Sequence, residues 1–270
     1  MRLLFCGDIV GRSGRQAVID HLPGLRRDLK LDFVIVNGEN AAGGFGITKK
    51  ICDELFALGV DVISGGNHIW DQREALGFID GENRLLRPIN FPAGTPGRGA
   101  QVYGAPGGRK VLVVNVMARL FMDPLDDPFA AVKQVLARYS LGASAAAIVV
   151  DFHGEATSEK MAMGHFLDGK VSACLGTHTH VPTADVMILP GGTAYQSDVG
   201  MCGDYDSVIG MDKKVPVTRF LRKLPTERLS PATGEGTLCA LFIETDDKTG
   251  LATRAEPVRV GGRLQQALPA

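Results

Sequence analysis

Two histidines separated by a single residue, His178 and His180, directly follow an apolar run at residues 171–175. In an extended chain alternate side chains point to the same side. Two imidazoles at the end of a strand can therefore converge above a sheet, where they suit Zn, Fe, Mn or Ni better than Ca or Mg. A polar loop explains this pair alone equally well, so the metal interpretation depends on the other histidines.

Further side chains that bind metals follow other short apolar runs. Each run is typical of a buried strand, and each is followed by a carboxylate, a carboxamide or an imidazole. These residues are Asp8, Glu39, Asn40, Asn67, His68 and His153. In an open α/β sheet, ligands bind beyond the carboxyl ends of the strands. Together with the histidine pair, this donor set lacks thiolates and is too large for one tetrahedral ion. It indicates two transition metal ions bridged by a carboxylate, an arrangement that holds the attacking and leaving oxygens of an in-line displacement.

The elements that position these residues alternate between strands and helices. In the first half we expect strands at 3–6, 33–36, 60–63 and 111–116, and helices at 13–29 and 48–58. Residues 88–110 are rich in proline and glycine and should form loop, with a short strand around residue 102. The second half predicts strands at 146–150, 171–175, 184–189, 193–196, 237–244 and 251–260, and helices at 126–139, 157–167 and 217–222. This alternation favours parallel βαβ units in one α/β domain spanning residues 1–270.

The composition is that of an ordinary globular chain. The 270 residues are 45% hydrophobic and 22% charged, and the net charge of −1 argues against an extended nucleic-acid track. No apolar run approaches the ~20 residues that a membrane span needs. The five cysteines are scattered without a Cys-x-x-Cys pair and should be reduced core residues. Since Asp8 interrupts the first apolar run, we expect a core strand there rather than a signal sequence, and hence a cytoplasmic protein.

Three motifs in fixed order, Gly7-Asp8, Gly66-Asn67-His68 and 176–180, resemble the calcineurin-like metallophosphoesterase superfamily. Within it the chain is most similar to the YmdB-type bacterial phosphodiesterases, over almost its whole length. The most specific stretches are 7–11, 37–41, 65–71 and 151–155. The resemblance implies a two-sheet α/β/β/α sandwich with a dinuclear metal centre. It also implies hydrolysis of small phosphodiesters, with 2′,3′- and 3′,5′-cyclic AMP as substrates.

The same resemblance assigns two groups of metal ligands. Asp8, Glu39 and His180 would hold one ion, and Glu39, Asn67, His153 and His178 would hold the other, with Glu39 as the bridge. Val10 stands where the wider superfamily has a histidine, so Asn40 or a water would fill that coordination position. The missing imidazole favours Fe or Mn there, with Zn and Ni as alternatives. A hydroxide between the ions would attack phosphorus while His68 protonates the leaving oxygen as a general acid.

Other residues near the motifs have a simpler structural interpretation. Packing is favoured over base stacking for Phe45 and Trp70, and solvation over phosphate binding for Arg12 and Lys49. Asp71, three residues after His68, either orients that imidazole or is an ordinary surface carboxylate.

His21 and His165 lie in predicted helices, far from any strand end, and should be structural or exposed. Two alternative functions stay open: a phosphomonoesterase or nucleotidase using the same centre, and a regulatory scaffold for RNA-processing partners. A homo-oligomer is compatible with either.

Overall fold

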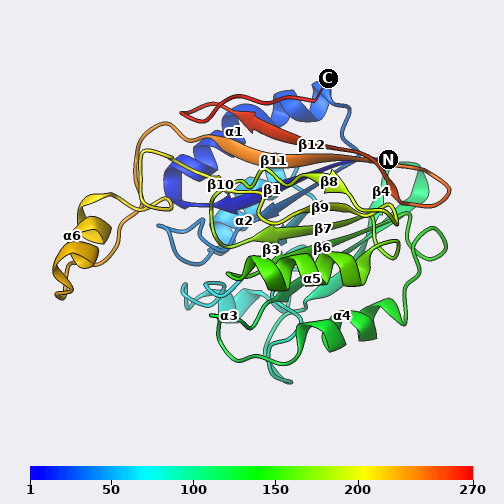
Figure 1. Ribbon diagram of the computed structural model, residues 1–270, viewed down its shortest axis with the longest axis horizontal. Coiled ribbons are helices and arrows are strands. Elements are labelled where there is room, and N and C mark those ends of the chain that lie inside the picture. The colour runs from blue at the N-terminus through cyan, green and yellow to red at the C-terminus, as the bar shows by residue number, and fades with distance from the viewer. Residues whose placement is uncertain (270) are drawn as a thin grey trace.

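Two mixed β-sheets pack face to face and carry helices on their outer faces (Figure 1). The computed structural model describes residues 1–269. The first sheet has the order β12-β11-β1-β2-β3, with β10 beside β1, and the second has the order β4-β5-β6-β7-β9-β8. The strands of the first sheet are β1 (Arg2–Ile9), β2 (Phe33–Asn37), β3 (Val62–Ser64), β10 (Met201–Cys202), β11 (Leu238–Thr245) and β12 (Ala252–Val260). Those of the second are β4 (Ala100–Ala105), β5 (Arg109–Met117), β6 (Ala147–His153), β7 (Ala173–Thr177), β8 (Met187–Ile188) and β9 (Ala194–Gln196).

The helices form the two outer layers, except for one that projects from the body. Helices α1 (Gly11–Asp28) and α2 (Lys49–Ala57) cover the first sheet, and α4 (Pro128–Leu136) and α5 (Thr157–Leu167) cover the second. A short helix α3 (Ala75–Phe78) and a 3-10 turn (Pro106–Gly108) lie in connections. Helix α6 (Lys214–Arg222) extends away from both sheets (Figure 1). Among the described residues, no helix combines the length and the apolar character needed to cross a bilayer.

Alternating side chains on the strands build three separate hydrophobic cores. On β1, Leu3 and Phe5 point into the core between the sheets, whereas Leu4 and Cys6 pack under α1 and α2. Burying one large aliphatic or aromatic side chain stabilises a fold by about 1.5–3 kcal/mol. With both faces of each sheet covered, the expected α/β/β/α sandwich is confirmed.

Parallel pairing brings the carboxyl ends of the central strands to one edge of the sandwich. Strands β1, β2 and β3 are parallel in the first sheet, and β5, β6, β7 and β9 are parallel in the second. The antiparallel strands β11, β12, β4 and β8 lie outside this parallel set. All the predicted metal donors therefore come from the same end of the fold.

Many predicted boundaries differ from the observed ones by a few residues, and three of these differences have a local reason. Strand β1 continues to Ile9, past Asp8, because β10 pairs with it there. The strand predicted at 184–189 shrinks to Met187–Ile188, since the Asp185 carboxylate accepts hydrogen bonds from the backbone and hydroxyl of Ser197 instead. Helix α6 begins at Lys214 rather than 217, because the Asp212 carboxylate accepts the Lys214 N–H at 3.0 Å.

Candidate metal centre

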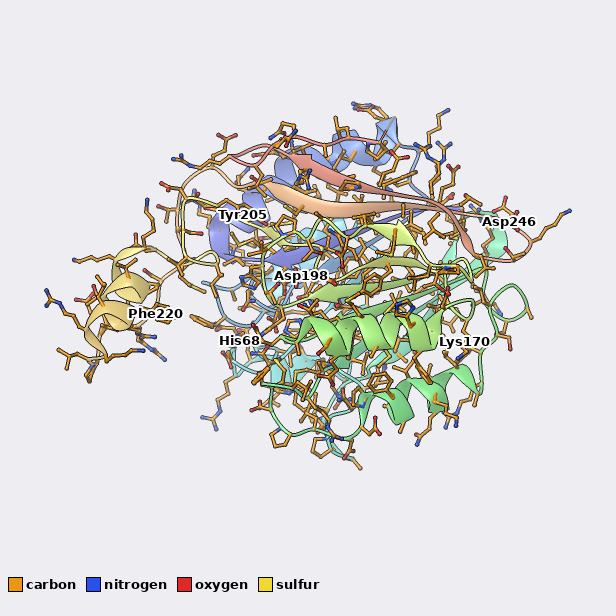
Figure 2. All side chains as sticks on the ribbon, in the orientation of Figure 1. His68, Lys170, Asp198, Tyr205, Phe220 and Asp246 are labelled. Carbon is orange, nitrogen blue, oxygen red and sulfur yellow. The ribbon has the colours of Figure 1, made fainter. Side chains whose placement is uncertain are left out.

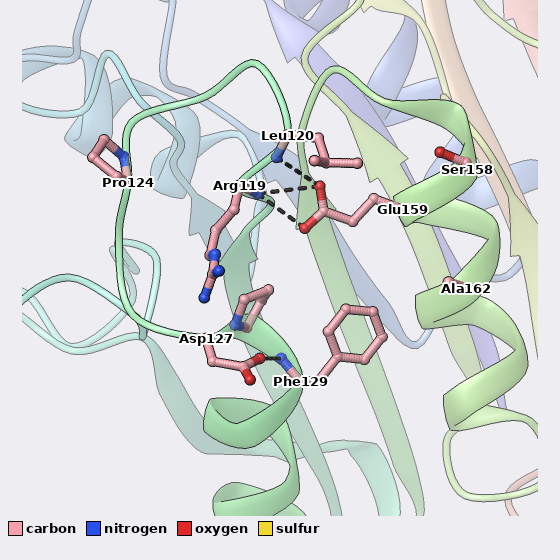
Figure 3. Close-up of a pocket in the computed structure, with 9 residues that line it drawn as sticks. Arg119, Leu120, Pro124, Asp127, Phe129, Ser158, Glu159 and Ala162 are labelled. Carbon is pink, nitrogen blue, oxygen red and sulfur yellow. Dashed lines mark hydrogen bonds between the residues drawn. The ribbon is translucent and has the colours of Figure 1, made fainter.

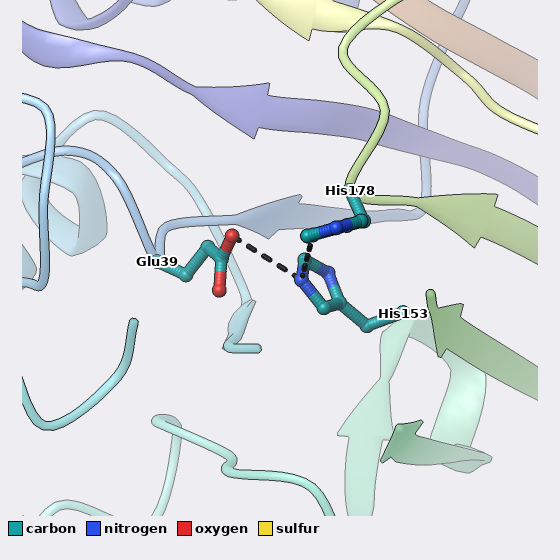
Figure 4. Close-up of side chains that lie close together, drawn as sticks. All are labelled: Glu39, His153 and His178. Carbon is teal, nitrogen blue, oxygen red and sulfur yellow. Dashed lines mark hydrogen bonds and ion pairs between the residues drawn. The ribbon is translucent and has the colours of Figure 1, made fainter. Parts of the chain in front are cut away.

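Two clusters of metal-binding side chains lie at this edge and share one carboxylate. Glu39, His153 and His178 form the first cluster (Figure 4), and Asp8, Glu39 and His180 form the second. In each cluster the donor atoms lie within 4.8 Å of one another. Asp8, Glu39 and His153 are fully buried. The structure therefore brings together the residues of both predicted ligand groups around a common Glu39.

In the first cluster four donor atoms converge with the spacing of ligands around one ion. His153 Nε2 lies 2.9 Å from Asn67 Oδ1, 3.1 Å from His178 Nδ1 and 3.2 Å from Glu39 Oε1. Two donors at right angles, each about 2.1 Å from a transition metal, are about 3.0 Å apart. These side chains can accordingly hold a transition ion with little movement.

The second cluster leaves two buried oxygens without a hydrogen-bond partner. They are Asp8 Oδ1 and Asn40 Oδ1. An unsatisfied buried acceptor costs about 1–3 kcal/mol, which a cation would relieve. Asp8 Oδ1 also lies 3.9 Å from His180 Nε2, so the two face a common point. Both clusters thus fit the metal ions that the donor set predicts.

Asn40 lies at the second cluster, but its nitrogen rather than its oxygen faces the other donors. Asn40 Nδ2 donates to Glu39 Oε1 at 2.9 Å and lies 3.2 Å from His180 Nε2. An amide coordinates metal through its oxygen, and a half-turn of the Asn40 amide would bring its unpartnered Oδ1 to the place of Nδ2, so Asn40 stays a predicted ligand. Val10 has a hydrocarbon side chain with no donor atom, and it is buried against Met201 and Met211.

Hydrogen bonds on the far side of each imidazole fix which nitrogen faces the centre. The Thr177 hydroxyl donates to Asp151 at 2.6 Å and therefore accepts from His153 Nδ1 at 2.9 Å. His180 Nδ1 donates to the Ile209 carbonyl at 2.8 Å. Both histidines consequently direct Nε2 into the centre, which is the nitrogen that would bind a metal ion.

His178 is oriented differently, with the opposite nitrogen of its ring toward the centre. Its Nε2 lies 3.3 Å from Glu155 Oε2, which leaves Nδ1 facing His153. Burial and the neighbouring His153 lower the pKa of His178 to about 3, so this imidazole is neutral and can ligate.

The carboxylates give the buried centre a strong preference for positive charge. Burial opposes the imidazolium form of His153, but Glu39, Asp8 and Asp151 outweigh that effect and raise its pKa to about 9. Burial raises the pKa of Asp8 despite two nearby imidazoles. For Glu39, His153 and His68 outweigh burial and lower the pKa. A proton on His153 thus balances charge that bound cations would otherwise balance.

The two histidines after β7 adopt unusual backbone conformations. His178 has φ of 99° and His180 has φ of 66°, in the left-handed region that non-glycine residues rarely occupy. The chain there is a tight turn, so the extended geometry predicted for the pair is wrong. Each imidazole reaches a different cluster instead of converging on one point.

A buried ion pair holds this turn in place. The Thr179 N–H donates to Asp198 Oδ2 at 3.0 Å, and Lys160 Nζ on α5 donates to the same oxygen at 2.8 Å. Lys160 and Asp198 are only 2% and 1% exposed. Asp198 was not predicted, although it follows β9 just as the metal donors follow other strands, and that signal would have found it.

A second buried network, also missed, ties the two sheets together beneath the centre. The Asp151 carboxylate accepts hydrogen bonds from Ser64 at 2.5 Å, Thr177 at 2.6 Å and Asn37 at 3.1 Å. These residues come from four different strands, β6, β3, β7 and β2. The network fixes the strand ends from which Glu39 and His153 project.

Gly66 lies directly against two donor side chains of the centre and leaves no room for a side chain of its own. A Cβ atom at this position would lie 2.2 Å from Glu39 Oε2 and 2.4 Å from His153 Nε2. Any side chain would therefore displace both donors, so the glycine in the motif at 65–68 is required by close approach rather than by backbone conformation.

His68 lies at the rim of the centre with its side chain 31% exposed. Its backbone N–H donates to Glu39 Oε2 at 3.0 Å, which fixes its position relative to the shared carboxylate. Its Nδ1 bonds Asp71 Oδ2 at 2.8 Å, so Asp71 orients this imidazole. The ring of Phe45 packs edge-on against it at 5.2 Å. Nε2 of His68 forms no hydrogen bond with any of the described residues.

The remaining residues, for which a structural or solvated role was expected, have structural partners or lie at the surface. Lys49 pairs with Asp53, and Trp70 packs against Phe91 in the core under α2. Arg12 and His165 are exposed, and His21 is half-buried on α1.

Two cavities have volumes in the upper part of the range of small-molecule sites. One, of about 830 Å³, is lined by Phe45, Asp71 and Gln72 and so opens beside His68. The other, of about 640 Å³, lies between the segment 119–129 and α5 (Figure 3). Of the two carboxylates that line it, Glu159 already accepts hydrogen bonds from the backbone N–H groups of Arg119 and Leu120. The first cavity adjoins His68 through Phe45 and Asp71, and none of the metal-binding side chains lines it.

Known proteins have similar sequences and similar folds. The family described as YmdB-like protein matches residues 4–258. A Bacillus subtilis (strain 168) protein named 2′,3′-cyclic-nucleotide 2′-phosphodiesterase is 46% identical over 260 residues, covering 96% of this chain and 97% of its own. The crystal structure of a hypothetical protein from Thermus thermophilus has a TM-score of 0.90 at 43% identity, covering 97% of this chain and 100% of its own.

A second solved structure is also similar to this chain. It is a Mycoplasma pneumoniae protein described as a novel phosphatase, with a TM-score of 0.89 at 32% identity, covering 97% of this chain and 93% of its own. The similarity of these proteins extends over nearly the whole length of the chain, which includes the motifs that carried the resemblance. The chain belongs to the YmdB-like protein family.

Proposed function

We propose that the chain is a metal-dependent phosphodiesterase that hydrolyses small cyclic nucleotides, with 2′,3′-cyclic nucleotides as its main substrates. The observation that carries the proposal is the pair of buried clusters sharing Glu39, placed beside a rim histidine. A 46% identical relative named for this activity supports the same substrate class. The 3′,5′-cyclic nucleotides are a second substrate of the same centre.

We assign the first ion to Glu39, Asn67, His153 and His178. We assign the second to Asp8, Glu39 and His180, with Asn40 or a water in the position that Val10 leaves open. A set of carboxylates, amides and imidazoles without thiolates favours Fe or Mn, with Zn or Ni as alternatives. Bound ions would neutralise the phosphate charge and lower the pKa of a nucleophilic water. The protein supplies the fixed donor positions and the buried surroundings.

His68 acts on the leaving group. Water adds its oxygen to phosphorus and the bond from phosphorus to the ribose O2′ breaks, so that a 3′-phosphomonoester is released. His68 Nε2 donates the proton that O2′ needs, while Asp71 holds the imidazole through Nδ1. In the net reaction water restores that proton to His68.

A substrate panel tests the proposal. The metal-loaded protein should turn over 2′,3′-cyclic AMP with a higher kcat/KM than 3′,5′-cyclic AMP, and either with a higher value than AMP. The description of the Mycoplasma pneumoniae structure as a phosphatase favours one second candidate, a phosphomonoesterase. A higher kcat/KM for AMP would establish that candidate in place of the phosphodiesterase.

A further inference from the structure

The cleft beside His68 extends outward to the projecting helix α6. Its inner wall carries Phe45 and Asp71, both of which contact the His68 imidazole. Its outer wall carries Arg219 of α6 and Arg228 of the segment that follows. Figure 2 shows how far α6, with Phe220, stands from the sheets. The cleft therefore connects the reacting end of the site to a separate, basic surface.

The two arginines are available for an anion. Arg219 is held by hydrogen bonds from Nε to Thr226 at 2.5 Å and from Nη2 to the Glu227 carbonyl at 3.1 Å. Arg228 is exposed and forms no hydrogen bond or ion pair with any residue in the described range 1–269. The carboxylate of the opposite wall, Asp71, is already paired with His68. The outer wall consequently presents two positive charges that form no ion pair with a carboxylate of the described residues.

The size of the cleft points to more substrate than one nucleotide. None of the assigned metal ligands lines it, so its volume of about 830 Å³ is additional to the space where the cyclic phosphate reacts. Pockets for whole drug-sized ligands span about 300–1,000 Å³. Guanidinium groups match phosphate oxygens in geometry and charge. A basic groove that also carries an aromatic ring is typical of single-stranded nucleic-acid binding.

We propose that this cleft is a subsite for the nucleotide preceding the cyclic phosphate, and that the substrates include short RNA fragments ending in a 2′,3′-cyclic phosphate. This inference rests on the proposed function. The bond broken is the same: water adds to phosphorus, the bond to O2′ breaks, and O2′ takes a proton. The rest of the fragment continues from the terminal O5′ to an internucleotide phosphate, which Arg219 and Arg228 bind.

The test compares two substrates of the metal-loaded protein at low salt: 2′,3′-cyclic AMP, and the adenosine dinucleotide ending in a 2′,3′-cyclic phosphate. The readout is the ratio of their kcat/KM values, dinucleotide over mononucleotide. We expect a ratio of about 10 for the unmodified chain, because one charge-assisted phosphate contact is gained. Arg228→Gln should lower this ratio about 10-fold, mainly through KM, and Arg228→Lys should keep part of it.

Arg222→Gln is the matched control. This arginine lies in the last turn of the same helix but does not line the cleft, so its substitution should leave the ratio unchanged. A ratio near 1 in the unmodified chain, or an equal loss on both substrates in Arg228→Gln, would overturn the subsite. Failure to hydrolyse 2′,3′-cyclic AMP at all would instead overturn the proposed function.

Discussion

Replacing His68 by asparagine separates its chemical role from a structural one. The backbone N–H that bonds Glu39 is retained in this variant, so the shared carboxylate keeps its position. What is lost is the imidazole, together with its bond to Asp71. The change therefore removes the proposed proton donor and leaves the metal-binding side chains intact.

The expected loss follows from the surroundings of the ring. Positioned general acids contribute about 10²–10⁴-fold to a rate. With 31% of the side chain exposed, water competes with His68 as a proton donor. We therefore expect the lower part of that range, a fall in kcat of about 10²–10³-fold on 2′,3′-cyclic AMP.

The assay sets a poor leaving group against a good one. A ribose alkoxide needs a proton to leave, whereas p-nitrophenolate does not, so bis(p-nitrophenyl) phosphate should lose less than about 10-fold. Metal content, measured in the same samples, should be unchanged. An equal loss on both substrates would refute the general-acid assignment, and loss of metal would make His68 a ligand.

Other parts of the site give further expectations. Asp71→Asn should lower kcat on 2′,3′-cyclic AMP about 10-fold while metal content is unchanged, since it only weakens the orientation of His68; an unaltered kcat would make Asp71 an ordinary surface carboxylate. Lys160→Met leaves the Asp198 charge buried and should lower the free energy of unfolding in urea by about 3–5 kcal/mol. The exposed Lys133→Met on α4 should change it by less than about 0.5 kcal/mol, and equal effects would contradict the buried pair. Burial raises the pKa of Cys52 and of Cys239 to about 12, and all five thiols are buried, so a disulfide reagent at pH 8 should label the protein only after unfolding. Fast labelling of the native chain would refute this.

The ligand clusters were predictable because of a simple property of parallel sheets. Glu39, Asn67 and His178 each follow a short apolar run, and parallel strands bring their carboxyl ends to one edge. The motif order then identified the superfamily, and with it the division of the donors around Glu39. The family match and the two-sheet fold confirm the family and the architecture.

Contacts between distant segments were beyond prediction from local pattern. Strand β10 is only two residues long and is defined by its pairing with β1, so it is too short to show a strand pattern in the sequence. The left-handed turn at His178 is imposed by Asp198 and Lys160, which lie about twenty residues away on either side. The Asp151 network joins side chains from both sheets, a relation that only the packed sandwich creates.

Counting metal ions tests the central claim most directly, because every assigned role depends on two ions that share Glu39. Elemental analysis of the purified, dialysed protein should find about two transition ions per chain. Glu39→Gln should retain less than one, Asn67→Ala about one, and the exposed control Glu54→Gln on α2 both. A single tightly held ion in the unmodified chain, or two in Glu39→Gln, would contradict the shared-carboxylate centre.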